Sequence, residues 1–335
     1  MDNYKSNRWI GVIFFGAALS VGNMPIASAQ RNAAGEAANY PHKPIRLIVP
    51  FAPNGPNDLL ARMVGQKLTE SWNQQTVIDN RPGAGTIIGT DLAARATPDG
   101  YTLLMISSST AVNPTLKKKL PYDTLRDLTP VVRLASSPNV LVVNPSVPAK
   151  SAAELIALAK SQNGKIAYAS GGTGTATHLA GELFCSMAGV KMTHVPYKGA
   201  GPATLDLLGG RVSWMFGTIL PTLPHIRSGK LRAIGISSEQ RSPALPDVPA
   251  IAETLPGFEA TSFYGIAAPA GTPKTIVAKL NSEIARIIKS PEMREQLQRQ
   301  GADAVGDTQA EFDAFFRKQI GKWARVIQEA GIQAD

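Results

Sequence analysis

Two short loops in the sequence carry the residue types that could hold a small anion. The first follows the apolar segment RLIVPF (46–51) and contains Asn54 and Gly55, and the second follows KIAYAS (165–170) and reads GGTGTAT. Both lead into segments whose apolar residues have helical spacing. A helix N-terminus offers unpaired backbone N–H groups and the positive end of the helix dipole, so each loop could bind a carboxylate without a cationic side chain.

The two loops belong to an approximate internal repeat. RLIVPFAPNGPNDLLARMVGQKL and KIAYASGGTGTATHLAGELFCSM both contain a buried strand, a loop rich in Gly, Pro or Thr, and an amphipathic helix. In a parallel α/β sheet such loops lie at the carboxyl edge of the strands, where ligands bind. One loop in each of two lobes would suit a ligand with two anionic ends. Ordinary strand–helix connections share this layout, so a purely structural role stays open.

The residue patterns of several other kinds of site are missing. GGTGTAT lacks the Lys-Ser/Thr pair of a phosphate-binding loop, and no G-x-S-x-G segment of a serine hydrolase occurs. The strand HVPY is followed by Lys198 rather than by an acidic residue for a dinucleotide ribose. The histidines lack the helical spacing of metal ligands, and His178, in the first turn of a helix, favours a structural role. The sequence therefore predicts no catalytic residues, no metal and no cofactor, and a protein that is not an enzyme.

From Ile45 onward, short apolar segments alternate with helical patterns, which predicts βαβ units and mainly parallel sheets. The expected strands are 46–51, 76–80, 101–107, 165–170, 194–197, 212–216 and 231–237. Capping residues, first-turn prolines and apolar spacing predict helices that begin at or just after Pro56, Ile88, Ser151, Thr177, Pro273, Pro291 and Thr308. The three helices of the tail are expected to pack on the first lobe.

Two extended segments divide the chain into lobes. VVRLASSPNVLVVNPS, after Leu128, contains no long helix and predicts a crossing into a second domain, and SFYGIAAPAG (262–271) predicts the return. We therefore expect one α/β lobe from 40–135 and 262–335, a second from 136–261, and a hinge of two crossing segments with a ligand cleft between the lobes. The length of 335 residues suits two domains.

The N-terminus has the pattern of a secretory signal peptide. Lys5 and Arg8 precede an apolar run from Trp9 to Val21, and Ala27-Ser28-Ala29 forms a small-residue cleavage site. The run is shorter than the roughly 20 residues of a membrane-spanning helix. We predict cleavage after Ala29, a flexible lead-in over residues 30–39, and a periplasmic mature protein.

The charge distribution argues against a nucleic-acid partner, and the cysteine content argues against a disulfide. The formal net charge is +9, but the basic residues are dispersed apart from Lys117-Lys118-Lys119. Dispersed charge on an exported protein indicates a solvated surface rather than a nucleic-acid site. The single Cys185 cannot form an intrachain disulfide, and its apolar helical setting predicts a buried thiol.

The clearest indication of function is a resemblance to a known family. The segments DNRPGAGTIIGT, TPDGYTLL, ASGGTGTATHLAGELF, HVPYKGAGPATLDLLGGRVSWMF and GKLRAIGISSEQRSPALPDVPAIAE occur in one continuous order. Together they resemble the Bug family, the periplasmic receptors of tripartite tricarboxylate transporters, over essentially all of 40–335. The resemblance implies a type II periplasmic binding-protein fold that closes on its ligand. It also implies carboxylates held by backbone amides, hydroxyls and bridging waters rather than by arginine.

The resemblance further implies which residues lie at the ligand. They belong to the first-lobe loop, to the serines that end the third strand, to the second-lobe loop and to four positions further along. For Tyr197 and Asp206 a structural role is equally open. Asn54 stands where the family pattern has glycine, which adds a side-chain amide there. The candidate ligand-binding residues are Phe51, Ala52, Pro53, Asn54, Gly55, Asn57, Asp58, Ser107, Ser108, Ser109, Gly172, Thr173, Gly174, Thr175, His178, Tyr197, Asp206, Gly217 and Thr218.

These features predict a monomeric receptor that captures a small carboxylate for the membrane subunits of a transporter. The ligand stays open among dicarboxylates, tricarboxylates, acidic amino acids and aromatic or nicotinate-like acids. One alternative is a periplasmic sensor that presents the ligand to a membrane signalling partner, because the same fold serves both roles. A secreted enzyme acting on a carboxylate is a further alternative, which would need a nucleophile–base pair in the cleft.

Overall fold

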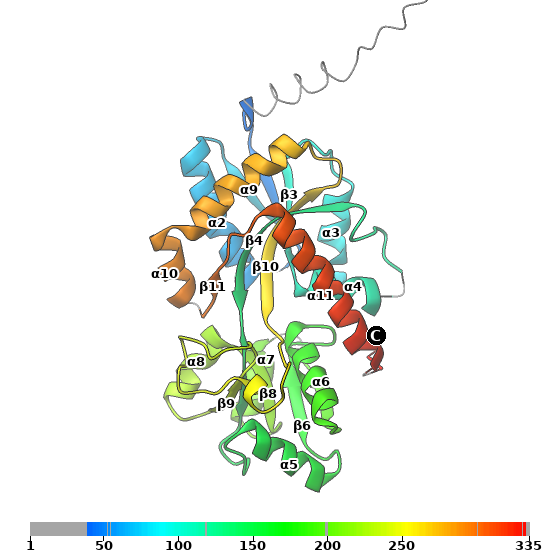
Figure 1. Ribbon diagram of the computed structural model, residues 1–335, viewed down its shortest axis with the longest axis vertical. Helices are drawn as coiled ribbons and strands as arrows, with labels where there is room; N and C mark the ends of the chain where they lie inside the picture. The colour runs from blue at the N-terminus through cyan, green and yellow to red at the C-terminus, as the bar shows by residue number, and fades with distance from the viewer. Residues whose placement is uncertain are drawn as a thin grey trace, which may run out of the picture.

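The computed structural model describes residues 39–51, 53, 55–117, 119–197, 200–299, 301–329 and 331–332. These residues form two α/β lobes, one above the other in Figure 1, and each lobe is built on its own sheet. The predicted two-lobe α/β fold is thereby confirmed. The expected signal peptide, and the lead-in up to residue 38, lie outside the described residues.

The first sheet has six strands and the second has five. In spatial order the first sheet contains β11 (Asp303–Ala304), β4 (Leu128–Ser137), β10 (Ser262–Pro269), β3 (Thr102–Ser107), β1 (Ile45–Val49) and β2 (Thr76–Asn80). The second contains β7 (Thr193–Pro196), β6 (Ala167–Ser170), β8 (Trp214–Thr218), β5 (Asn139–Val143) and β9 (Arg232–Ile236). All seven strands expected from the alternating pattern are present.

Both sheets are mixed, so the expectation of mainly parallel pairing was wrong. β1 pairs in parallel with β2 and β3, and β6 with β7 and β8, as βαβ units require. β10, however, lies antiparallel between β3 and β4, and β5 lies antiparallel between β8 and β9. Each of these two strands enters its lobe from the other lobe. Because each strand begins at the edge where the lobes meet, it is antiparallel to the neighbouring strands that end at that edge.

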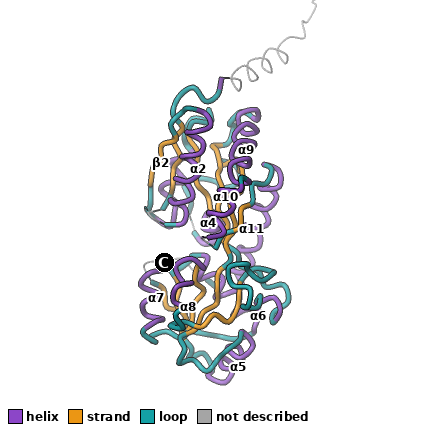
Figure 2. The backbone as a smooth tube through the Cα atoms, turned by 90° about the vertical axis from the view of Figure 1, so that its left-hand side faces the viewer, coloured by secondary structure: helices purple, strands orange, loops and turns teal. Residues whose placement is uncertain are grey.

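Helices cover both faces of each sheet (Figure 2). The first lobe has α2 (Pro56–Trp72), η1 (Ala84–Thr86), α3 (Ile87–Ala94), α4 (Ser108–Leu116), α9 (Lys274–Lys289), α10 (Pro291–Arg299) and α11 (Gln309–Glu329). The second has α5 (Ala152–Gln162), α6 (Ala176–Ala188), α7 (Ala200–Leu208), α8 (Ile219–Arg227) and η2 (Ile251–Glu253). Alternate residues of β3 separate two cores in the first lobe. Leu103 and Met105 pack with α2 and α9, whereas Leu104 and Ile106 pack with α4 and α11.

The last helix, α11, contacts both lobes, although the sequence predicts that the whole tail packs on the first. It packs against α4 and β4 and also against α6 of the second lobe (Figure 1). Trp323 and Ile327 share a buried cluster with Phe184 of α6, and Lys322 bonds to Glu259 in the segment that returns from the second lobe. A helix of 21 residues is about 30 Å long, which is sufficient to reach across the junction.

The two crossing segments are bonded to each other. Only Pro138 separates β4 from β5, and β4 extends to Ser137, two residues beyond the expected lobe boundary. Asn139 Nδ2 donates to the Ala260 carbonyl at 2.8 Å, and the Ser237 hydroxyl donates to the same carbonyl at 3.0 Å. The Asn139 N–H donates to Ser237 Oγ at 2.7 Å. Short segments with shared hydrogen bonds restrict how the lobes can move relative to each other.

Candidate functional site

The strand register brings the predicted loops to the lobe edges beside the two crossings. Ser107 at the end of β3 pairs with Tyr264 near the start of β10, and Thr218 at the end of β8 pairs with Asn139 at the start of β5. β1 is parallel to β3, and β6 is parallel to β8. The loops after β1 and β6 therefore open at these same edges, so the candidate residues of the two lobes lie on the sides that meet.

A cavity of about 440 Å³ lies between the lobes. Three helices begin at its wall, because Pro56 is the first residue of α2, Ala200 is the first of α7, and Thr218 directly precedes α8. Their N-termini supply backbone N–H donors and positive dipole ends from both lobes. The lining residues are Pro56, Leu59, Leu60, Ala135, Ser137, Ala200, Thr218, Pro221, Tyr264, Leu297 and Ala302.

The loop after β1 is attached to the end of β2. Asn80 Nδ2 donates to the Phe51 carbonyl at 3.2 Å and to Asp58 Oδ1 at 2.9 Å. Asp58 is 0% exposed and also accepts from Arg62 Nε at 3.0 Å, so its carboxylate holds α2 to β2 rather than lining the cavity. Asn57 Oδ1 is buried and lacks a hydrogen-bond partner among the described residues.

The other candidates of this loop are placed differently. Gly55 is the N-cap of α2, Pro53 is exposed, and Phe51 is half-buried against the core beneath α2. Ala52 and Asn54 lie outside the described residues. The consequence of asparagine at position 54 therefore stays a prediction.

The serines at the end of β3 begin a further helix at the same edge. Ser107 is the N-cap of α4, and its N–H donates to Thr110 Oγ1 at 3.3 Å. Ser108 is buried, and its hydroxyl oxygen accepts from the Phe263 N–H of β10 at 3.3 Å. Ser109 is half-buried. The first two serines thus fasten β3, α4 and β10 together, and none of the three is among the residues that line the cavity.

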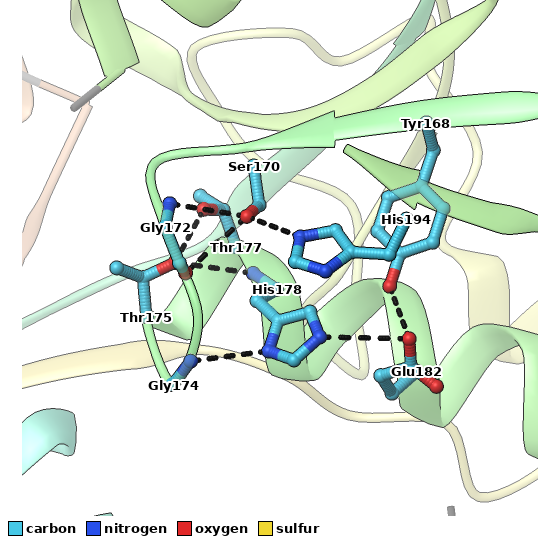
Figure 3. Close-up of polar contacts among 9 residues, drawn as sticks. All are labelled: Tyr168, Ser170, Gly172, Gly174, Thr175, Thr177, His178, Glu182 and His194. Carbon is cyan, nitrogen blue, oxygen red and sulfur yellow. Dashed lines mark hydrogen bonds and ion pairs between the residues drawn. The ribbon is translucent and has the colours of Figure 1, made fainter. Parts of the chain in front are cut away.

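The loop after β6 is closed by hydrogen bonds of its own (Figure 3). Thr175, the N-cap of α6, accepts from the His178 N–H at 3.3 Å and donates its hydroxyl to the Gly172 carbonyl at 2.7 Å. The Gly174 N–H donates to His178 Nδ1 at 3.1 Å. Gly172 and Gly174 have φ values of +126° and +78°, which glycine adopts without a steric penalty. Thr173 is half-buried in the same loop.

A stack of rings lies behind this loop (Figure 3). The imidazoles of His178 and His194 stack with centroids 3.9 Å apart, and the Tyr168 ring follows at 5.0 Å from His194. The Trp214 ring stacks on the other side of Tyr168 at 4.7 Å. His178 is 3% exposed, and because its Nδ1 accepts a hydrogen bond, the neutral ring carries its proton on Nε2, 3.5 Å from Glu182 Oε1. This geometry agrees with the structural role that the sequence favours for His178.

Glu182 is the charged group of this buried cluster. Burial acts to raise its pKa, but the hydrogen bonds from His178 and Tyr168 and the electrostatic influence of the two imidazoles outweigh burial, so the pKa is lowered. Burial, and then the Glu182 carboxylate, raises the pKa of Tyr168, which donates its hydroxyl to Glu182. Sequence reasoning missed Tyr168, Glu182 and His194. The four-residue spacing of His178 and Glu182 on one helix was the available signal.

The remaining candidates of the second lobe separate into two groups. The Tyr197 hydroxyl donates to Asp206 Oδ2 at 2.7 Å, and Asp206 also pairs with Arg211. The hydrogen bond from Tyr197, and then that from Arg211, lowers the pKa of Asp206, and the Tyr197 bond ties the segment after β7 to α7. Gly217 is buried in β8, where a Cβ would lie 2.6 Å from Thr222 Oγ1. Thr218 is the candidate of this region that lines the cavity.

Residues at the cavity that the sequence analysis did not single out come from both lobes. Ala200 lies in the small-residue segment VPYKGAGPA, in which α7 begins, and this segment was a usable signal for a helix N-terminus. Leu59 and Leu297 are apolar helix residues that the pattern does not distinguish from core positions.

Among the described residues, no group of three His, Cys, Asp or Glu side chains is placed to hold a metal, and no helix is long and apolar enough to cross a membrane.

Comparison with known proteins identifies the family. Residues 60–332 match the model of the tripartite tricarboxylate transporter family receptor. The chain belongs to this family. BugT of Bordetella pertussis is 41% identical over 316 residues, which cover 93% of this chain and 97% of BugT. The resemblance to the Bug family is thereby confirmed, and the members of this family are periplasmic solute-binding receptors rather than enzymes.

Two similar solved structures have ligands. Rpa4515 of Rhodopseudomonas palustris, solved with adipate, is 34% identical with a TM-score of 0.80 and covers 88% of this chain and 99% of its own. MatC of the same organism, solved with malate, is 31% identical with a TM-score of 0.75 and covers 86% of this chain and 100% of its own. The type II binding-protein fold that the resemblance implied is confirmed.

Proposed function

We propose that this receptor binds a small carboxylate between its two lobes in the periplasm and delivers it, as a monomer, to the membrane subunits of a tripartite tricarboxylate-type transporter. The observation that carries the proposal is the cavity between the lobes, where α2, α7 and α8 begin. The carboxylate ligands of two family members, adipate and malate, support the same ligand class.

The carboxylate is held by backbone N–H groups at the helix N-termini. No charged side chain is found among the described residues that line the cavity, so this part of the wall offers an anion backbone N–H groups rather than a cation. Backbone N–H groups and helix dipoles suit this task because they are fixed before the ligand arrives. Asn57, whose Oδ1 is buried without a described partner, adds an amide group in the first turn of α2.

Ligand binding closes the lobes about the two crossings. The crossing segments are short and share hydrogen bonds at Asn139, Ser237 and Ala260, so the lobes move as units while the crossings absorb the change. Closure brings the N-termini of α2 in one lobe and of α7 and α8 in the other toward one ligand. Small-angle scattering of the protein with a saturating ligand should show a smaller radius of gyration, and an unchanged radius would contradict closure.

A thermal-shift screen of the purified mature protein against small carboxylates tests the receptor function. A ligand present at about 100 times its Kd stabilises the fold by roughly 2.7 kcal/mol, which raises the melting temperature measurably. Calorimetric titration of each hit should then give a stoichiometry of one ligand per chain. The absence of binding by any di-, tri- or monocarboxylate across the screen would contradict the proposal.

Export by a signal peptide that is cleaved after Ala29 accompanies this function. The basic residues, the apolar run and the Ala27-Ser28-Ala29 triplet support it. Mass spectrometry of the protein recovered from the periplasm should give a mature chain that begins at Gln30. A membrane-bound form that retains residues 1–29 would contradict this part of the proposal.

A further inference from the structure

The wall of the cavity between the lobes is predominantly apolar. Eight of its eleven lining residues are leucine, alanine or proline, and the other three are Ser137, Thr218 and Tyr264. The Ser137 hydroxyl hydrogen is already donated to the Gly301 carbonyl at 3.0 Å. A charged group of a ligand that lay against these leucine, alanine and proline side chains would lose its water and find few hydrogen-bond partners, which is strongly unfavourable.

The position of the cavity distinguishes it from a packing defect. Its wall is shared between α2, β4, β10 and α10 of the first lobe and α7, β8 and α8 of the second, and its volume of about 440 Å³ is within the range of ligand pockets. Leu59 is 39% exposed at this wall, in the first turns of α2. Apolar side chains that stay exposed between two lobes are covered when an apolar group enters and the lobes close.

The polar groups of the cavity come from the helix N-termini, Ser137 and one tyrosine. Pro56, Ala200 and Thr218 mark the N-termini of α2, α7 and α8, while Leu59, Leu297 and Ala302 belong to the apolar part of the wall. Tyr264 also lines the cavity, and burial raises the pKa of its hydroxyl to about 12. This hydroxyl is therefore protonated at neutral pH and can donate a hydrogen bond.

We propose that the apolar part of this cavity binds the uncharged body of the ligand, and that the preferred ligand is a carboxylate attached to an aromatic ring. This inference rests on the proposed receptor function and assigns its ligand class. The carboxylate lies at the N-termini of α2, α7 and α8, and the ring packs against Leu59, Leu297 and Pro221. A ring is favoured over a flexible chain because it loses less conformational freedom on binding.

Calorimetric titration of the mature protein with benzoate, hexanoate and malate tests this assignment. We expect the Kd for benzoate to be at least tenfold lower than that for malate, and lower than that for hexanoate. Tighter binding of hexanoate than of benzoate would overturn the assignment of a ring. Equal or tighter binding of malate would overturn the apolar subsite and leave the carboxylate-receptor function intact. The failure of all three acids, together with a thermal-shift screen without hits, would overturn the receptor function itself.

A pair of variants separates the subsite from general effects on the fold. Leu59→Asn replaces part of the apolar wall by an amide and should raise the Kd for benzoate about tenfold, with little change for malate. Leu92→Asn on α3 is a matched control, because Leu92 is 38% exposed, is also a leucine on a helix, and does not line the cavity. The same Kd for benzoate in Leu59→Asn and in the parent protein would overturn the subsite.

Discussion

The loop after β6 is held by hydrogen bonds within its own strand–loop–helix unit, whereas the described part of the loop after β1 is held by a neighbouring strand. In the first case Thr175 and His178 bond to Gly172 and Gly174. In the second, Asn80 of β2 bonds to the Phe51 carbonyl and to the Asp58 carboxylate. Two loops with one sequence layout thus depend on different parts of the molecule for their shape.

The two loops show that the position of a loop and the conformation of a loop have different causes. The strand–loop–helix layout determines the edge at which the loop emerges, because both loops follow parallel strands. Local fastening of the second loop orders it before the ligand arrives, so less entropy is lost on binding. The first loop depends on a carboxylate that also anchors α2, so its shape is coupled to the stability of the whole lobe.

The largest effect is expected for Asp58→Ala. It removes a fully buried carboxylate and leaves Asn80 and Arg62 without this partner, so the free energy of unfolding should fall by about 3 kcal/mol. Urea unfolding followed by circular dichroism measures this change. Asp91→Ala is the matched control, because Asp91 also pairs with an arginine four residues later but is partly exposed, and it should cost less than about 1 kcal/mol. Equal losses of unfolding free energy in the two variants would contradict the role given to the Asp58 carboxylate in holding the first loop.

Gly174→Val should damage the second loop and ligand binding together. A side chain at Gly174 would clash with Leu116 of α4, and its φ of +78° disfavours a β-branched residue, so we expect a loss of about 2 kcal/mol in stability. We also expect at least a tenfold weaker affinity by calorimetry. Gly189→Val, at a φ of +61° with open space around it, should lower stability but leave affinity unchanged. Loss of affinity in both variants would contradict a local role for Gly174.

Glu182→Gln tests the charge behind the second loop. The pKa of Glu182 is lowered in the folded protein, so its ionised form stabilises the fold above the ordinary pKa of a glutamate, and this contribution is lost as the pH falls through the lowered value. The variant should be less stable than the parent by about 1 kcal/mol at pH 7, after allowance for solvent screening. The two should converge as the pH falls below the ordinary pKa of a glutamate and through the lowered value in the folded protein. A constant difference in unfolding free energy from pH 7 to pH 3 would contradict this.

An effect of similar, modest size is expected for Thr175→Ala. The hydroxyl hydrogen of Thr175 is donated to Gly172 and its oxygen caps α6, so its role in binding is indirect. Loss of the cap should reduce stability by about 1 kcal/mol and weaken binding by a similar free energy. Thr175→Ser keeps the hydroxyl and should restore both quantities. Failure of serine to restore binding would indicate that the methyl group, and not the cap, is what matters.

The fold was predictable wherever the signal is local. TVIDN coincides with β2, and the cap at Ser151 is made by its hydroxyl with the Glu154 N–H. Pro273 directly precedes α9, and Pro291 is the first residue of α10. Strand directions were not predictable, because β5 and β10 look like any other apolar segment. Their antiparallel pairing follows from the path of the chain between lobes, and it joins residues far apart in the sequence, such as Tyr264 with Ser107 and Asn139 with Thr218.

The site was predictable to the level of its loops and less so to the level of side chains. Ligand contact at the candidate residues stays a prediction. The structure nevertheless shows why some positions were ambiguous: the Tyr197–Asp206 pair and the stack of His178 on His194 join residues through side-chain contacts that no spacing rule specifies. The apolar wall around Leu59 was not predictable either, because a leucine at helical spacing has the same pattern whether it faces a core or a cavity.

The central position of β10 in the first sheet has a consequence for the order of folding. β10 lies between β3 and β4, so the first sheet is split until the chain has been made as far as Pro269. The strands of the second lobe, by contrast, form one continuous stretch from Asn139 to Ile236. During synthesis the second lobe can therefore become compact while the first waits for its middle strand. β1, β2 and β3 can pair early with one another, whereas β4 joins them only through β10.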